Sequence, residues 1–190
     1  MVSLIGYGNH GKDIEAIFLR AYKSDKRLTI YDDDPTRTTE LLDFITGKIL
    51  IGVNDPTIRH QIADRFSRLR GASPLIDPSV IRGIDVELGR GVVVAPGAVL
   101  LRSVILGNHC HVNYLASMTR CTIGDYSTIS PAATICGNVT IGEDCYVGAN
   151  STICERSTIG NHVTVGAGAV VLPWSIVPDN TRVVGVWKNP

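Results

Sequence analysis

An aliphatic residue returns every six positions over about half of this 190-residue chain. A small residue precedes nearly every one by two positions, and glycine often follows it. The aliphatic positions are Leu88, Val94, Leu100, Leu106, Val112, Met118, Ile123, Ile129, Ile135, Ile141, Val147, Ile153, Ile159, Val165 and Val171. Neither a helix nor an alternating strand has this period. The pattern predicts a parallel β-helix in which three hexapeptides make one coil of about 18 residues, giving about five coils.

The rhythm shortens once. Met118 and Ile123 are five residues apart instead of six, so one residue is missing from the corner that contains Thr119 and Arg120. In a pattern otherwise this regular, the deletion must reshape that corner.

The five cysteines fit the same repeat. Cys110, Cys121 and Cys145 occupy small inward positions, whereas Cys136 and Cys154 follow aliphatic positions at corners. Because none has the CxxC spacing of a metal or redox site, we expect reduced thiols, no disulfide and no bound metal.

Charge is unevenly distributed between the segments. Residues 1–79 hold 22 of the 36 charged residues, whereas residues 80–172 hold 11. This shift predicts an N-terminal domain over residues 1–79, the coils over residues 80–172 and a tail over residues 173–190.

The N-terminal segment begins with an apolar strand at residues 2–5, a G-x-G-x-x-G turn and a helix from residue 13. Further strands are expected at residues 28–31, 48–53 and 75–76, and a helix at residues 57–69. This order predicts a small α/β, Rossmann-like unit in which Gly6, Gly8 and Gly11 approach a phosphate. The alternative to phosphate binding is that these glycines allow the strand and the helix to pack closely.

Asp32 and Asp33 follow the second expected strand. They either contact a uracil or ribose or lie at a solvated strand end.

The zero formal charge and the lack of a basic run argue against a nucleic-acid-binding protein. No apolar stretch reaches about 18 residues, so no membrane span is expected. The start at Met1 lacks the basic residues and cleavage site of a secretory signal. The expected location is cytoplasmic.

Several motifs together resemble the sialic acid O-acetyltransferase-like family of sugar acyltransferases, which includes nucleotide-amino-sugar N-acetyltransferases. They are Gly-Asn-His-Gly at residues 8–11, the acids at 32–33, Asp-Pro-Ser at 77–79, Ile-Ser-Pro-Ala at 129–132, and the segments 137–142, 165–171 and 177–185.

The resemblance implies a left-handed coil, a homotrimer, and acetyl transfer from acetyl-CoA to a nucleotide-linked sugar for surface polysaccharide. It also implies that His10 contacts the nucleotide sugar, with a turn-stabilising hydrogen bond as the alternative. The positions that it assigns to acetyl-CoA are Gly148, Ala149, Gly166, Ala167 and Lys188.

The resemblance fails at the catalytic corner. The family carries Val-Glu-His-Asp-Cys there, and its His is the general base. Here Arg120 takes the His place when counted from Met118, and Thr119 takes it when counted back from Gly124. Neither side chain is a base near neutral pH. The family's second His is Thr128 in this chain.

Two residues are candidates for the remaining catalytic roles. His111 precedes an inward residue, so its side chain is expected to point outward, one coil before Thr128. It is either a replacement for the lost base or a residue of the groove that takes no part in the chemistry. Gly137 is either an oxyanion donor or simply a conformational glycine. His60, His109 and His162 are expected at the surface.

Two alternatives to an acetyltransferase stay open. The first is a binding or assembly protein that kept the trimer and lost the chemistry. The second is a nicotinamide-dependent enzyme that uses the Gly-rich turn.

Overall fold

The structure is a computed structural model, and it describes residues 2–6, 8–22, 27–31 and 47–189. Within these ranges the N-terminal part holds a parallel sheet in the order β2-β1-β3-β4. Its strands are β1 (Val2–Ile5), β2 (Leu28–Tyr31), β3 (Lys48–Ile51) and β4 (Arg70–Gly71). Helices α1 (Asn9–Tyr22) and α2 (Pro56–Arg65) accompany this sheet.

Both helices have local reasons to begin and pack where they do. Asp55 caps α2 by accepting a hydrogen bond from the Ile58 amide at 2.9 Å, and Pro56 fills the first helical position. Helix α1 buries Ile14, Ile17 and Phe18, which lie three and four residues apart and so share one face.

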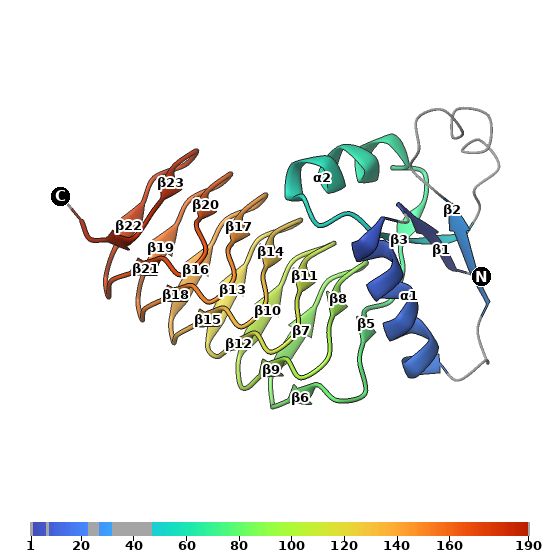
Figure 1. The fold of residues 1–190 in the computed structure, drawn as a ribbon, viewed down its shortest axis with the longest axis horizontal. Helices are drawn as coiled ribbons and strands as arrows, with labels where there is room; N and C mark the ends of the chain where they lie inside the picture. The colour runs from blue at the N-terminus through green and yellow to red at the C-terminus, as the bar shows by residue number, and fades with distance from the viewer. Residues whose placement is uncertain (1, 7, 23–26, 32–46, 190) are drawn as a thin grey trace.

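The rest of the chain forms a left-handed parallel β-helix, which Figure 1 shows as a stack running from the helices to the C-terminus. Every coil contributes one short strand to each of three faces, so each face is a parallel sheet. Face I comprises β7 (Val86–Leu88), β10 (Val104–Leu106), β13 (Cys121–Ile123), β16 (Val139–Ile141), β19 (Thr158–Ile159) and β22 (Ile176–Val177). Face II comprises β5 (Leu75–Ile76), β8 (Val93–Val94), β11 (His111–Val112), β14 (Thr128–Ile129), β17 (Tyr146–Val147), β20 (Thr164–Val165) and β23 (Arg182–Val183). Face III comprises β6 (Ile81–Arg82), β9 (Val99–Leu100), β12 (Ser117–Met118), β15 (Thr134–Ile135), β18 (Thr152–Ile153), β21 (Val170–Val171) and β24 (Val186–Trp187).

The coil is longer than the sequence analysis predicted. Strand β5, expected in the N-terminal sheet, pairs with β8, and β24 pairs with β21 in the segment expected to be a tail. Six or seven strands per face replace the predicted five coils, within residues 47–189. At the N-terminal end, Arg82 interrupts the six-residue rhythm between Ile76 and Leu88. At the C-terminal end the rhythm continues through Val177 and Val183, which are buried in the same core and were not included in the predicted repeat.

The interior confirms the inward assignments of the repeat. The small positions, from Val92 to Ala169, are all buried together with the aliphatic ones from Val94 to Val171. At the corners, non-glycine residues adopt left-handed backbone conformations with φ between 43° and 62°. Asn, Asp and His tolerate this region best among such residues, and they occupy seven of these corners.

The N-terminal unit packs on face II of the first coils (Figure 1). Its apolar core includes Val93 and Ala95 from the coil, and a second cluster is joined by Tyr126. The outward side of face II is therefore covered near the helices, which determines the surroundings of the candidate site.

Candidate active site

A cavity of about 310 Å³ lies between helix α1 and face II. Its lining residues are His10, Asp13, Ala16, Ile17, Arg20, Val93, Ala95, Pro96, His111, Val112, Asn113 and Tyr114. An apolar wall with a few convergent polar groups is typical of a small-molecule site.

Two histidines that the sequence separates by 101 positions meet at this cavity. His10 Nε2 lies 2.8 Å from His111 Nδ1, so one ring donates a hydrogen bond to the other. The sequence analysis placed His111 outward in a groove; it does face outward from the coil, but the N-terminal unit covers it to 1 % exposure. His111 Nε2 is buried and has no hydrogen-bond partner among the described residues.

Both histidines are held in the neutral form. Burial, reinforced by the Arg59 charge, lowers the pKa of His10 to about 4. Burial and the Arg59 charge, together with the neighbouring His10 and His109, also lower the pKa of His111 well below its usual value. Each ring therefore carries one donor and one acceptor nitrogen at neutral pH. When His111 Nδ1 is the donor, His111 Nε2 carries a free lone pair and is a base.

Arg59 of α2 holds the N-terminal unit on the coil. Its guanidinium is fully buried and donates hydrogen bonds to five acceptors. They are His109 O at 2.8 Å, Val53 O at 2.7 Å, Asn54 O at 3.2 Å, Thr128 Oγ1 at 2.8 Å and Tyr126 O. Burial lowers the pKa of Arg59 to about 10, so the side chain stays charged at neutral pH.

Thr128, which stands at the place of the family's second histidine, takes part in this contact. Its hydroxyl donates to Asn54 O at 2.8 Å and accepts from Arg59. The residue is fully buried, so its role in this chain is docking of the N-terminal unit.

The shortened corner follows β12 and leads from face III to face I. The Arg120 amide donates to Arg102 O and the Asn138 amide donates to Arg120 O, and Arg120 shares its left-handed backbone with Ser103 and Asn138. Arg120 is therefore the last corner residue of its coil, and the missing residue lies between Thr119 and Arg120. The position equivalent to Gly137 of the next coil is absent.

The side chain of Arg120 covers the place that the deletion leaves. A Cβ added to Gly137 would lie 3.0 Å from Arg120 Cζ, so the guanidinium rests against Gly137 and would have to move aside for a larger residue. The predicted oxyanion residue is thus buried beneath a positive charge.

Four of the residues predicted to bind acetyl-CoA lie at the corners between faces II and III, whereas Lys188 follows β24 of face III. Gly148 and Gly166 stack on consecutive coils, because a Cβ on Gly148 would lie 2.7 Å from Gly166 C. Ala149 is half-buried, whereas Ala167 and Lys188 are exposed. Gly148 is buried beneath the next coil, so Ala149 and Ala167 are the more accessible of the small residues at that edge.

The predicted site residues do not converge within one chain. His111 lies on face II, Gly137 follows face III, and Gly148 follows face II two coils later. Among the described residues, the structure brings together His10 with His111 and stacks Gly148 on Gly166, but it does not join these two groups.

The glycines of the Gly-rich turn have different surroundings. Gly6 has a φ of 86°, a conformation that favours glycine. A Cβ on Gly52 would meet the Gly6 carbonyl oxygen and would lie 2.8 Å from Gly11 Cα. Gly6 and Gly11 therefore serve close packing against Gly52. A Cβ on Gly8 would meet nothing within 4 Å, which leaves its backbone approachable. Asp32 and Asp33 lie outside the described residues.

Two of the remaining histidines, His60 and His109, are more buried than the sequence predicted. His109 is buried, stacks on Tyr126 with ring centroids 5.6 Å apart, and burial lowers its pKa to about 4. His60 stacks on the other side of the same ring and lies 2.7 Å from Asp144. The contact of Asp144 with His60 was missed because it depends on how α2 docks on the coil, which the repeat does not reveal.

Comparisons with known proteins agree with this architecture. The model for bacterial transferase hexapeptide (six repeats) matches residues 120–155. The acetyltransferase domain of PglB from Neisseria gonorrhoeae is 29 % identical, with a TM-score of 0.87 over 97 % of this chain and 96 % of that chain. The resemblance to hexapeptide-repeat sugar acyltransferases is confirmed.

Another sugar acyltransferase is similar over nearly the same length. A His-to-Asn variant of perosamine N-acetyltransferase from Caulobacter crescentus, in complex with CoA and GDP-perosamine, is 25 % identical, with a TM-score of 0.82 over 97 % of this chain and 93 % of that chain. The bifunctional protein GlmU of Mycolicibacterium smegmatis is 32 % identical over 103 residues, which are 49 % of this chain but only 21 % of that protein.

Among the described residues, no helix is both long and apolar enough to cross a membrane.

Proposed function

We propose that this chain is an acetyl-CoA-dependent N-acetyltransferase of nucleotide-linked amino sugars in surface polysaccharide biosynthesis. The observation that carries the proposal is the near full-length similarity to the PglB acetyltransferase domain, which also has a structure in complex with acetyl coenzyme A. The GDP-perosamine and CoA complexes of the Caulobacter relative support the same pair of substrates.

In this reaction the sugar amine attacks the thioester carbonyl. A C–N bond forms, the C–S bond breaks, the amine loses a proton, and CoA leaves as the thiol. His111 Nε2 is our candidate for the group that accepts the proton, with His10 orienting the ring through the 2.8 Å hydrogen bond. Its lowered pKa makes it a weak base that is nevertheless always unprotonated at neutral pH.

The deletion supports a departure from the family's usual chemistry. Met118 and Cys121 stand at the ends of its Val-Glu-His-Asp-Cys motif, and the backbone register supports an alignment of Thr119 with the Glu and Arg120 with the Asp. In this proposal the deleted residue is the catalytic His itself. Arg120 leaves a fixed positive charge against Gly137, which suits the oxyanion that forms on the thioester carbonyl.

Because the predicted residues lie on different faces of one chain, we further propose that the site is completed in a homotrimer. Light scattering on the purified chain tests this: the trimer has three times the 20.4 kDa mass of one chain. A monomer at working concentrations contradicts this part of the proposal.

The function is tested by mixing the protein with acetyl-CoA and nucleoside-diphosphate amino sugars, GDP-perosamine among them, and following free thiol. His111→Asn keeps an amide near the Nδ1 position but removes the base, and we expect about a 100-fold lower kcat. Inserting His between Thr119 and Arg120 should raise kcat by about the same factor, with an Ala insertion as the control for spacing.

The shortened corner favours the second candidate, a binding or assembly protein. This candidate predicts that the chain binds CoA but releases no thiol with any sugar. Failure of both binding and turnover across the panel contradicts the acetyltransferase proposal.

A further inference from the structure

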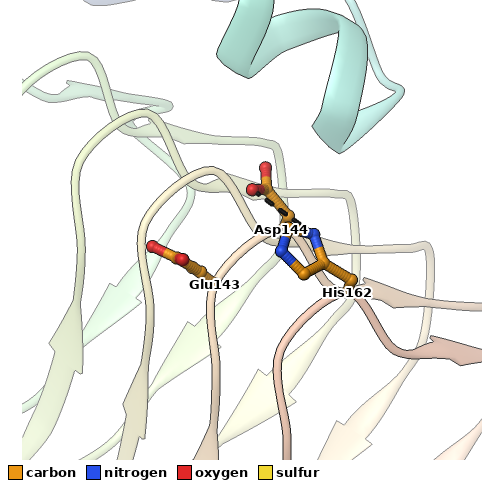
Figure 2. Close-up of side chains that lie close together, drawn as sticks. All are labelled: Glu143, Asp144 and His162. Atoms are coloured by element: carbon orange, nitrogen blue, oxygen red, sulfur yellow. Dashed lines mark ion pairs between the residues drawn. The ribbon is translucent and has the colours of Figure 1, made fainter. Parts of the chain in front are cut away.

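Three polar side chains gather at the corner between faces I and II, away from the cavity. Glu143 and Asp144 follow β16, and His162 occupies the matching corner one coil later, where the His162 amide donates to Glu143 O at 2.9 Å. One potential ligand atom from each residue lies within 4.8 Å of the other two. Figure 2 shows Asp144 and His162 paired, with the Glu143 side chain extending to one side of the pair.

Asp144 is the buried member of this cluster. Its side chain is 2 % exposed, yet Oδ1 has no hydrogen-bond partner among the described residues. A buried carboxylate oxygen without a partner is costly, because the charge has lost its water. A cation at this point would restore the lost interaction.

The two histidines near Asp144 Oδ2 stand at different distances. His60 Nδ1 lies 2.7 Å away, which is the length of a hydrogen bond, whereas His162 Nδ1 lies 3.6 Å away, which is too long for one. Two ligands that each bind a tetrahedral Zn²⁺ at about 2.0–2.1 Å lie about 3.3 Å apart. The separation of His162 from Asp144 is close to that of two ligands of one metal ion.

The cluster is reachable from solvent through a cavity, and a neighbouring histidine holds its buried carboxylate. A cavity of about 320 Å³ opens beside Asp144 and His162 and also touches Asp55 at the start of α2. It provides room for a water or a small ligand as the fourth metal ligand. His60 donates a hydrogen bond to the same carboxylate oxygen, Oδ2, and would orient the Asp144 carboxylate as hydrogen-bonding partners of metal ligands commonly do.

We propose that Glu143, Asp144 and His162 bind a divalent transition metal of the Zn²⁺ class, with His60 as an orienting partner. The imidazole in the donor set favours such a metal over Mg²⁺, which prefers oxygen ligands. Because His60 belongs to α2, the bound metal would also fasten the N-terminal unit to the coil.

The experiment uses the full chain, freed of any tag and treated with a chelator. Titration calorimetry with ZnCl2 should give one ion per chain, and MgCl2 should give no comparable binding. Glu143→Gln should weaken Zn²⁺ binding at least about tenfold, and because Glu143 is exposed this variant keeps the fold. Glu155→Gln, at an exposed corner of another edge, is the matched control and should bind as the wild type does.

His162→Asn is the second variant, because Asn180 already occupies the equivalent corner of the next coil with φ 57°. We expect Zn²⁺ to raise the Tm of the wild type but not that of His162→Asn. Equal Zn²⁺ affinity in the wild type and both ligand variants, or no binding at micromolar concentration, overturns the proposal. Neither readout depends on acetyl transfer, so failure here is distinct from failure of the proposed function.

Discussion

Replacing Arg59 with Met tests the contact that joins the N-terminal unit to the coil. Met keeps much of the apolar stem but removes the guanidinium. Five oxygen acceptors then lose their donor, three of them on coil residues: His109, Tyr126 and Thr128. The variant therefore removes one side chain while disturbing both parts of the molecule.

The magnitude follows from two opposing contributions. Hydrogen bonds from a charged donor contribute about 1.5–3 kcal/mol each, and Arg59 makes five. Against this, the fall of its pKa from 12.5 to about 10 corresponds to a burial cost of about 3 kcal/mol. Taking the lower hydrogen-bond value, we expect Arg59→Met to reduce the free energy of unfolding by about 4 kcal/mol, or the Tm by about 10 °C.

Thermal unfolding followed by circular dichroism measures the change, and hydrogen exchange locates it. Amides of α2 should exchange faster in the variant, whereas those of the distant coils should not. Arg65→Met, an exposed change on the same helix, is the control. A loss below about 1 kcal/mol with unchanged exchange in α2 would refute the assignment of Arg59 as the principal docking residue.

Three further outcomes are expected. His111 should stay neutral in 15N NMR spectra down to pH 5.5, where an ordinary imidazole is about nine-tenths protonated; an imidazolium signal there contradicts its lowered pKa. Under native conditions a thiol reagent should label only Cys136 and Cys154, because the other three thiols are buried and their pKa values are raised to about 11 or 12; labelling of all five contradicts this packing. Gly8→Ala should leave the Tm unchanged, whereas Gly52→Ala should cost about 2 kcal/mol, since only the second new Cβ meets backbone atoms; equal Tm values contradict this.

Burial of the histidines also makes stability depend on pH. The pKa of His10 is about 4 in the folded chain, so below pH 6.5 the unfolded chain binds a proton that the folded chain does not. Stability should therefore fall as the pH drops from 6.5 toward 4, by about 3 kcal/mol from this residue alone. Urea unfolding at a series of pH values measures the slope, and a flat profile contradicts a neutral buried His10.

The repeat predicted the coil well because each of its positions has a fixed direction. A six-residue period determines which side chains point inward, and residues such as Val112 and Ile129 are buried as expected. The same period places residues 18 apart on one corner, so the approach of His162 to Asp144 was available from the sequence.

What the period does not reveal is which outward face another segment covers. His111 and Thr128 point away from the coil axis, as the spacing predicts, yet both are buried because the N-terminal unit lies on them. That docking depends on Arg59, one of two arginines in α2, and no sequence pattern distinguishes it from the exposed Arg65. The location of the missing corner residue likewise needed backbone hydrogen bonds, since counting from either side gave two answers.

The parallel coils also bear on the order in which the chain folds. Strand partners in the coil lie 16 to 18 residues apart, as for Val170 with Val186 and Thr140 with Thr158, so each coil can add to its predecessor with a short loop closure. Arg59, in contrast, requires acceptors up to 69 residues downstream. On a ribosome, the N-terminal unit emerges before Thr128 exists, and its buried cation must remain hydrated until β14, the fourth strand of face II from the docking end, has formed. Docking would then be a late event, completed only after the coil beneath it has been built.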